Sequence, residues 1–334
     1  MAPGLSRGRV LLDDAAVLSV AVHLRRLVRL LAISCAACGV AQSPSEQPER
    51  LAHTSRVLCL CATADGKTVF GGGADGSLVV WTRATGPAPE PTVVRAHDQH
   101  VLAIGCSADG SLIATGCRGG VLRVWHAATT KMAWESRRHT AAIQDLCFAA
   151  DGSLITVSHD RTVRWWNVQT GEETRVRRHE AQVYSVAVSA DGTKVFTGGD
   201  DPGLRVWDAR TGEQLDFVPG TGNQYFALAS GAEGRLVAGG PWLALFVQTD
   251  VRGSVRQFRD RAHHGWIDAV AFSRDGSKVA SGGEDGVVRV WDVESGREEC
   301  TLIGHAGGVA AVLFLGDGEV LAAADDRGVL LHRL

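Results

Sequence analysis

The sequence predicts an all-β fold: a seven-bladed β-propeller of four-stranded antiparallel blades, preceded by a short helical or disordered N-terminal extension. Three observations predict it. A tight-turn dipeptide recurs seven times, short β-rich runs separate the turns, and the composition is rich in Gly (40 of 334) but poor in Pro (9). With 45% hydrophobic and 21% charged residues, the chain has enough apolar material for a sizeable core.

The repeat is defined by a Gly that follows Asp or Glu, in steps of 44, 42, 40, 42, 42 and 42 residues. The seven pairs are Asp65-Gly66, Asp109-Gly110, Asp151-Gly152, Asp191-Gly192, Glu233-Gly234, Asp275-Gly276 and Asp317-Gly318. Eight residues before each turn stands an apolar or aromatic residue, namely Val57, Val101, Ile143, Val183, Tyr225, Ile267 and Val309. Seven units in one register indicate a repeat architecture.

Each unit contains four strand-like runs. In the fourth unit, residues 183–188 lead into an Asp-Gly turn, residues 194–199 follow it, and a third run ends at Trp207 before a Thr-Gly-Glu turn and a fourth run. Asp-Gly favours a tight hairpin because Gly accepts a positive φ. Four strands in about 42 residues make one propeller blade, and a closed ring of blades leaves no inner sheet edge exposed.

Three motifs carry a family resemblance: Val-Trp-Asp at 206–208 and 290–292, Gly304-His305, and Ser-Gly-Gly-Glu-Asp-Gly at 281–286. With these motifs the chain resembles the WD-repeat propellers over residues 46–334. The resemblance implies repeats that start near residues 53, 97, 139, 179, 221, 263 and 305. It specifies the fold and leaves the function open, because one fold hosts many functions.

The resemblance also implies a buried His, Ser or Thr, Asp and Trp network in each blade. Three blades look complete, with His139, Thr156, Asp160 and Trp166; His179, Thr197, Asp201 and Trp207; and His263, Ser281, Asp285 and Trp291. We interpret these sets as structural and not catalytic, because they recur in several blades, whereas an active site need not be repeated around a ring. Other blades depart from the pattern, with Gly71 at the hydroxyl position of the first blade and neither His nor Trp in the fifth.

Residues 46–52 are expected to supply the outer strand of the seventh blade, because the chain stops two residues after His332. Residues 1–45 form a separate extension in which Leu11–Ile33 is expected to be helical. Charged residues interrupt its apolar stretches, so none reaches the roughly 20 residues that span a bilayer. A targeting role for this extension, which would make the protein exported, organellar or membrane-associated, remains an alternative.

Charge and cysteine usage exclude other classes of function. A net charge of −3 argues against a nucleic-acid partner. Eight Cys residues without paired metal-ligand spacing favour a reducing, cytoplasmic setting and predict neither a metal nor another cofactor. Val, Ala, Leu and Cys dominate the innermost strands, so no convergent carboxylates are expected in the central channel. We expect a monomeric ring, with an oligomer left open.

Function is therefore expected on a propeller face, as a non-catalytic scaffold for protein or peptide partners. The resemblance places that site where the first strands of the blades begin. The candidates are the aromatic residues Tyr184, Phe226 and Trp266, the acidic residues Asp200, Asp268 and Glu284, and the residues Arg56, His100 and Arg118 across the ring. In the third blade the same positions hold Gln144 and His159. The second alternative is a small-molecule-binding or enzymatic propeller that uses the central channel.

Overall fold

The computed structural model describes ten segments of the chain, namely residues 49–83, 90–219, 225–231, 235–240, 243–248, 255–257, 263–305, 307–315, 319–324 and 328–334. The chain divides into two compact units, Met1–Ser43 and Pro44–Leu334. The predicted extension of residues 1–45, with its expected helix, lies outside the described residues.

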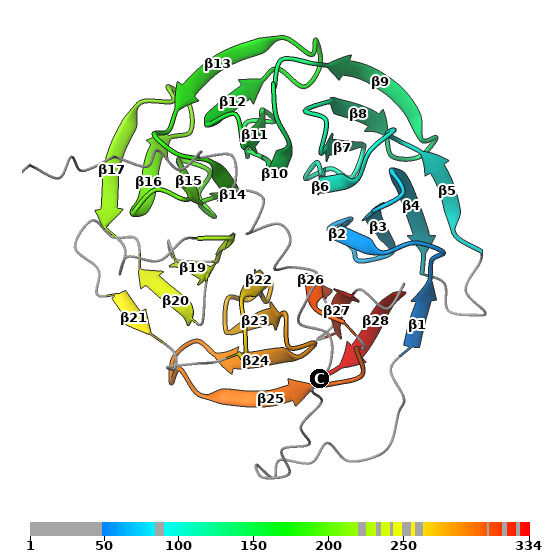
Figure 1. Ribbon diagram of the computed structural model, residues 1–334, viewed down its shortest axis with the longest axis vertical. Helices are drawn as coiled ribbons and strands as arrows, with labels where there is room; N and C mark the ends of the chain where they lie inside the picture. The colour runs from blue at the N-terminus through cyan, green and yellow to red at the C-terminus, as the bar shows by residue number, and fades with distance from the viewer. Residues whose placement is uncertain are drawn as a thin grey trace, which may run out of the picture. The chain divides into compact units, whose positions relative to one another are not determined.

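The described residues form 28 strands in seven four-stranded antiparallel sheets, arranged side by side around a centre (Figure 1). The innermost strands are β2 (Val57–Ala62), β6 (Val101–Cys106), β10 (Ile143–Phe148), β14 (Val183–Val188), β18 (Ala227–Ser230), β22 (Ile267–Phe272) and β26 (Val309–Leu315). The second strands are β3 (Thr68–Gly73), β7 (Leu112–Cys117), β11 (Leu154–Ser158), β15 (Lys194–Gly199), β19 (Arg235–Gly240), β23 (Lys278–Gly283) and β27 (Glu319–Ala324).

The third strands are β4 (Ser77–Thr82), β8 (Leu122–His126), β12 (Thr162–Trp166), β16 (Gly203–Asp208), β20 (Leu243–Gln248), β24 (Val288–Asp292) and β28 (Gly328–Arg333). The outermost strands are β5 (Thr92–Arg95), β9 (Lys131–Ser136), β13 (Glu173–Arg178), β17 (Gln214–Pro219), β21 (Val255–Gln257), β25 (Glu298–Leu302) and β1 (Glu49–Ala52). We number the sheets as blades one to seven by their innermost strands, so that β26, β27, β28 and β1 make blade seven.

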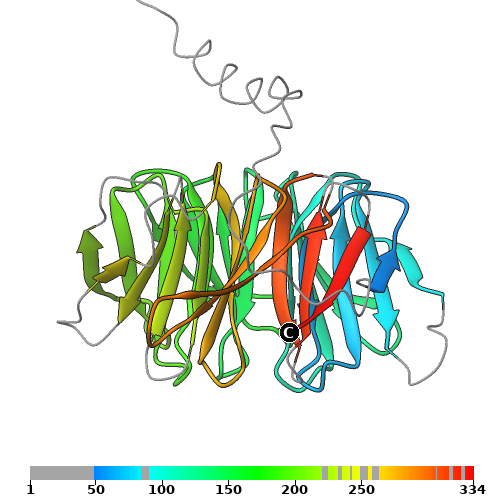
Figure 2. The same ribbon diagram turned by 90° about the horizontal axis from the view of Figure 1, so that it is seen from below.

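The ring is held by apolar packing between neighbouring blades. Each innermost strand contacts the next one along the chain, and β26 contacts β2. The described residues contain seven buried clusters, and each joins two adjacent blades. In one of them Val157 and Trp165 of blade three pack against Val186 and Trp207 of blade four. Figure 2 shows the strands running between the two faces of the ring.

Blade seven is completed by the N-terminal strand of the unit. β1 pairs antiparallel with β28, with Leu51 opposite Val329. Leu51 is buried in a cluster with Trp81 and Leu331, and Trp81 Nε1 donates a hydrogen bond to the Ala52 carbonyl at 3.2 Å. The described part of the predicted closing segment 46–52 therefore binds the last strand of the chain to the first blade.

The prediction of a tight Asp-Gly hairpin is wrong in detail. In blade one the loop between β2 and β3 has a turn in which Gly66 N–H donates to the Thr63 carbonyl at 2.8 Å, and Thr63 N–H donates to the Thr68 carbonyl at 2.9 Å. Gly66 follows this turn with a φ of 67°, and Asp65 Oδ1 accepts the N–H of Lys67 at 3.1 Å. The loop is a longer turn that ends in a left-handed residue, a second common solution for antiparallel strands.

The seven blades do not all follow the family pattern, and they depart from it where the sequence does. Among the described residues, five blades have a buried His that hydrogen-bonds a hydroxyl, in the pairs His53–Ser77, His97–Thr115, His139–Thr156, His179–Thr197 and His263–Ser281. In blade seven the rings of His305 and His332 lie 5.6 Å apart instead. Blade five has no such pair within its described residues, which include neither a His nor a Trp.

Candidate functional site

The innermost strands start with a β-bulge at the same end of six blades. In blade four, Val183 pairs with Gly199 and Ser185 with Gly198, which leaves Tyr184 as the extra residue. The equivalent extra residues of blades one, two, three, six and seven are Leu58, Leu102, Gln144, Asp268 and Ala310. A bulge redirects the side chain of its extra residue. Here it turns one residue per blade toward the centre of the ring.

These bulge residues and Phe226 of blade five line one cavity of about 200 Å³ at the centre of the ring. The cavity is lined by residues from the innermost strands of all seven blades or directly preceding them, and most of its lining is Leu, Ile, Val and Ala. Because the lining belongs to hydrogen-bonded strands, the shape of the cavity is set by the rigid part of the fold.

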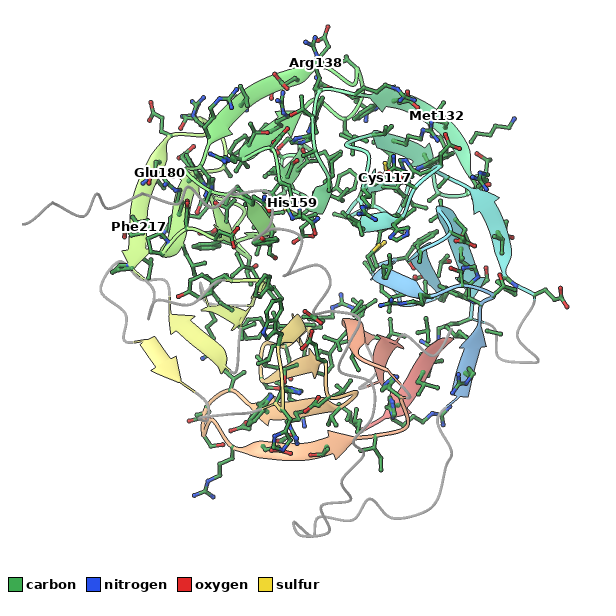
Figure 3. The ribbon with its side chains drawn as sticks, viewed as in Figure 1. Cys117, Met132, Arg138, His159, Glu180 and Phe217 are labelled. Atoms are coloured by element: carbon green, nitrogen blue, oxygen red, sulfur yellow. The ribbon has the colours of Figure 1, made fainter. Side chains whose placement is uncertain are left out.

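Four ring-bearing side chains form a continuous series beside this cavity, which we call the aromatic run. His159 packs edge-on against Tyr184 with ring centroids 5.1 Å apart. Tyr184 and Phe226 are 5.0 Å apart, and Phe226 stacks on Trp266 at 4.9 Å with 10° between the ring planes. The run crosses blades three to six, and all four side chains are partly exposed. Figure 3 shows His159 beside the centre of the ring, whereas Met132 and Arg138 lie on its outer rim.

Two of the predicted acidic residues hold the aromatic run in position. Tyr184 Oη donates to Asp200 Oδ2 at 3.0 Å. The Trp266 N–H lies 3.5 Å from Glu284 Oε2, and the Glu284 N–H donates to the Trp266 carbonyl at 3.0 Å. The third, Asp268, lines the cavity. The structure thus brings together the aromatic and acidic candidates that the sequence predicts.

The remaining candidates, Arg56, His100 and Arg118, are exposed residues of blades one and two. They occupy loops equivalent to those of the aromatic run, since the Arg118 N–H donates to the His100 carbonyl at 2.9 Å as the Asp200 N–H does to Gln182. These three residues are not part of the aromatic run. The face therefore has acidic and aromatic residues over blades four to six and basic residues over blades one and two.

The lining is dominated by the apolar residue types that the sequence analysis expected, but two carboxylates, Asp145 and Asp268, are also part of it. Asp145 Oδ2 accepts hydrogen bonds from Ser185 Oγ and the Val186 N–H, each at 2.9 Å, and Oδ1 accepts the Leu146 N–H at 2.8 Å. Burial raises the pKa of Asp145 to about 6, against the lowering effect of these three donors. The sequence signal was an Asp at a position where the other six blades have Cys59, Ala103, Ser185, Ala227, Ala269 and Ala311.

The buried networks have the hydrogen-bond arrangement that the family resemblance implies. In blade three, His139 Nδ1 lies 2.8 Å from Asp160 Oδ2 and His139 Nε2 lies 2.7 Å from Thr156 Oγ1, to which Trp166 Nε1 donates at 2.9 Å. Blades four and six repeat this arrangement with His179, Thr197, Asp201 and Trp207, and with His263, Ser281, Asp285 and Trp291.

The hydrogen-bond partners of His179 determine where the protons lie in its network. Burial lowers the pKa of His179 to about 4, so its imidazole is neutral at pH 7 and has one donor and one acceptor nitrogen. Because the Asp201 carboxylate can only accept, His179 Nδ1–H donates to it, and Nε2 is left to accept the proton of the Thr197 hydroxyl. Thr156, Thr197 and Ser281 are 0% exposed, so these hydroxyls are closed to any substrate.

An arginine on the third strand extends three of these networks outward, which the sequence analysis did not predict. Arg205 Nε donates to Asp201 Oδ2 at 2.8 Å. Arg164 and Arg289 lie near Asp160 and Asp285 in the same way and also pair with glutamates of the outermost strand. The i and i+4 spacing of these Asp and Arg residues was the available signal.

The described residues contain no group of three or more His, Cys, Asp or Glu side chains that could hold a metal ion. Within the same segments, no helix has the length and hydropathy needed to cross a membrane.

A family model described as "WD domain, G-beta repeat" matches residues 46–82, 90–126, 133–167, 171–208, 254–292 and 296–332. The matches cover more than half of the chain and leave out residues 209–253, which hold most of blade five. The chain is also similar to autophagy-related protein 16 of Arabidopsis thaliana, with 26% identity over 180 residues, which are 52% of this chain and 35% of that protein.

Two further relatives are denticleless protein homolog B of Xenopus laevis, 28% identical over 162 residues, and apoptotic protease-activating factor 1 of Rattus norvegicus, 24% identical over 211 residues. These alignments cover 48% and 58% of this chain, and 22% and 16% of the relatives. The chain thus spans about a third or less of the length of these relatives. On the six repeat matches and the ring of four-stranded blades, the chain belongs to the WD-repeat family.

Proposed function

We propose that this protein is a non-catalytic scaffold that binds a protein or peptide partner on the face of the aromatic run. The observation that carries the proposal is the contact of His159, Tyr184, Phe226 and Trp266 in one series across four blades. Aromatic side chains dominate binding hot spots because they bury a large area with few rotatable bonds. Tyr184 lies on a bulged strand, and Phe226 and Trp266 directly precede inner strands, which reduces the ordering entropy lost on binding.

The charges on the face give the partner an orientation. Asp200, Asp268 and Glu284 lie on the side of the aromatic run, and Arg56 and Arg118 lie over blades one and two. A partner segment that lies with its basic end over blades four to six matches the acidic residues there and keeps that end away from the basic residues of blades one and two. Such complementarity contributes mainly to specificity and to the rate of association.

The alternatives have less support. An enzymatic use of the buried Ser281, His263 and Asp285 set is opposed by the burial of that hydroxyl against Trp291. The cavity of about 200 Å³ is smaller than the roughly 300–1,000 Å³ of sites for drug-sized ligands. Export directed by residues 1–45 stays a prediction, to be tested by N-terminal sequencing of the mature protein. We also propose a cytoplasmic location, supported by the six described cysteines, all of which are free thiols.

The test replaces Tyr184, Phe226 and Trp266 together with Ala. We expect this variant to lose the partners that the wild-type protein captures from its own cells, as measured by affinity purification and quantitative mass spectrometry, while its melting temperature changes little. The matched control replaces Met132 and Leu215, which are 51% and 53% exposed on the outer strands, and should capture the same partners as wild type. Full capture by the triple variant rejects the face.

A further inference from the structure

Asp145 is a carboxylate in the central cavity that has no charged partner among the described residues. Its hydrogen-bond donors are all neutral: the Ser185 hydroxyl and two backbone N–H groups. No described residue forms an ion pair with it, and none of the lining residues is Lys, Arg or His. A carboxylate removed from water with no opposite charge is costly, and its raised pKa is a consequence of that cost. A cation that entered the cavity would offset part of the free-energy cost of burying this carboxylate.

The cavity has the size for one side chain. Its volume of about 200 Å³ lies below that of sites for drug-sized ligands. Apart from Asp145, Asp268, Gln144 and Ser185, the lining beneath the aromatic residues is apolar or has a thiol. The cavity suits a group with a slender aliphatic stem and a charged head, because the stem passes the apolar side chains of the lining while the head reaches a carboxylate.

The mouth of the cavity suits the same chemistry. Tyr184 and Phe226 belong both to the lining and to the aromatic run. Aromatic faces attract cations, and guanidinium groups in particular stack on them and also pair with carboxylates. A cation that passes these rings therefore has attractive contacts from the exposed face down to Asp145.

We propose that the central cavity receives a positively charged side chain of the partner protein, with Asp145 as its buried counter-ion and Tyr184 and Phe226 around its stem. The inference rests on the proposed function, since it requires a partner on the face of the aromatic run. It adds a chemical requirement: the bound segment presents a lysine or arginine above the centre of the ring.

The test uses the full chain and two blocked tripeptides, acetyl-Gly-Arg-Gly-amide and its neutral citrulline counterpart. We expect the arginine peptide to bind in the millimolar range and to shift the amide NMR signals of Val186 and Leu228, which lie beside Asp145 and Ser185. The citrulline peptide should bind at least tenfold more weakly, because it matches the arginine in shape and lacks the charge. Equal binding of the two peptides, or shifts confined to the outer strands, overturns the proposal.

Asp145→Asn keeps an oxygen that accepts hydrogen bonds and removes the charge, so it should weaken binding of the arginine peptide at least tenfold. Asp191→Asn, in an exposed turn outside the cavity, is the matched control and should bind as wild type does. If Asp145→Asn does not fold, the comparison of the arginine and citrulline peptides on the wild-type protein still tests whether the cavity receives a cation.

Failure of this inference is distinguishable from failure of the proposed function. If the aromatic triple variant loses the partner while wild type does not discriminate arginine from citrulline, the face binds a partner and the cavity receives no cation. If the arginine peptide binds selectively while the triple variant keeps its partner, the cavity binds cations and the partner uses another surface.

Discussion

Single residues in this propeller differ between blades in ways that change which neighbour they bind. Gly71 of blade one stands where Thr115 of blade two supplies a buried hydroxyl. A Cβ at Gly71 would lie 2.7 Å from the Trp81 ring, so that ring fills the space that a side chain would need. Trp81 Nε1 then donates to the carbonyl of Ala52 in place of a hydroxyl. The missing side chain in blade one thus turns its Trp toward the closing strand.

At the residue scale we predict that Gly71→Ser, which restores the family pattern on paper, destabilises the protein by about 1–3 kcal/mol through overpacking. The control is Thr115→Ser, which keeps the hydroxyl and removes one methyl group, at a cost of about 1 kcal/mol. Urea denaturation measures both. A Gly71→Ser variant as stable as wild type would show that Trp81 moves without cost.

At the scale of elements, hydrogen bonds at the inner side of the ring join blade five to blade four. The Leu228 N–H at the start of β18 donates to Ser185 Oγ of blade four at 2.9 Å, and Ser185 Oγ donates to Asp145 of blade three. Ser230 Oγ also donates to the Val188 carbonyl. This relay joins three blades at the inner side of the ring, where blade five has no described His–hydroxyl pair of its own.

We therefore predict that Ser185→Ala loosens blade five selectively. The change leaves the Leu228 N–H without its acceptor and removes one donor from Asp145, at a cost of about 1–3 kcal/mol. Hydrogen exchange of amides in β18 and β19 should accelerate by about tenfold for each 1.4 kcal/mol, while amides of blade two keep their rates. Ser111→Ala, in an exposed turn, is the control. Uniform acceleration around the ring would contradict a local role.

At the scale of the whole molecule, the two ends of the described unit meet in one sheet. β1 contributes its pairing with β28, the buried side chain of Leu51 and the carbonyl that Trp81 binds. Without β1, blade seven has an open outer edge and the interface between blades seven and one loses part of its core. Ring closure therefore depends on a strand of four described residues.

We predict that deletion of residues 46–52 lowers the stability of the entire ring by about 4–6 kcal/mol, from roughly 2 kcal/mol for Leu51 and about 1 kcal/mol for each lost hydrogen bond. Thermal unfolding measures the effect, and addition of a synthetic peptide of residues 46–55 should restore part of it. A truncation of residues 1–43 keeps β1 and should melt as wild type does. An unchanged melting temperature after the deletion of 46–52 would refute this account of closure.

The sequence by itself determined what is local and periodic. The spacing of the turn pairs located every innermost strand, since one blade needs a fixed length of chain. The family resemblance then pointed to Tyr184, Phe226 and Trp266 as candidates on one face. The same resemblance implied the buried networks, and the repeat register assigned their residues, because equivalent positions in a repeat occupy equivalent environments.

Only the tertiary structure decided what depends on contacts between blades. The stacking of Phe226 on Trp266 and the relay from Asp145 through Ser185 to Leu228 join residues about 40 positions apart. The local sequence pattern carries no information on such pairs, because the register within one blade does not specify the distance between side chains of neighbouring blades. The buried charge in the cavity also depends on a contact between blades, because Asp145 of blade three is held by Ser185 and Val186 of β14 in blade four.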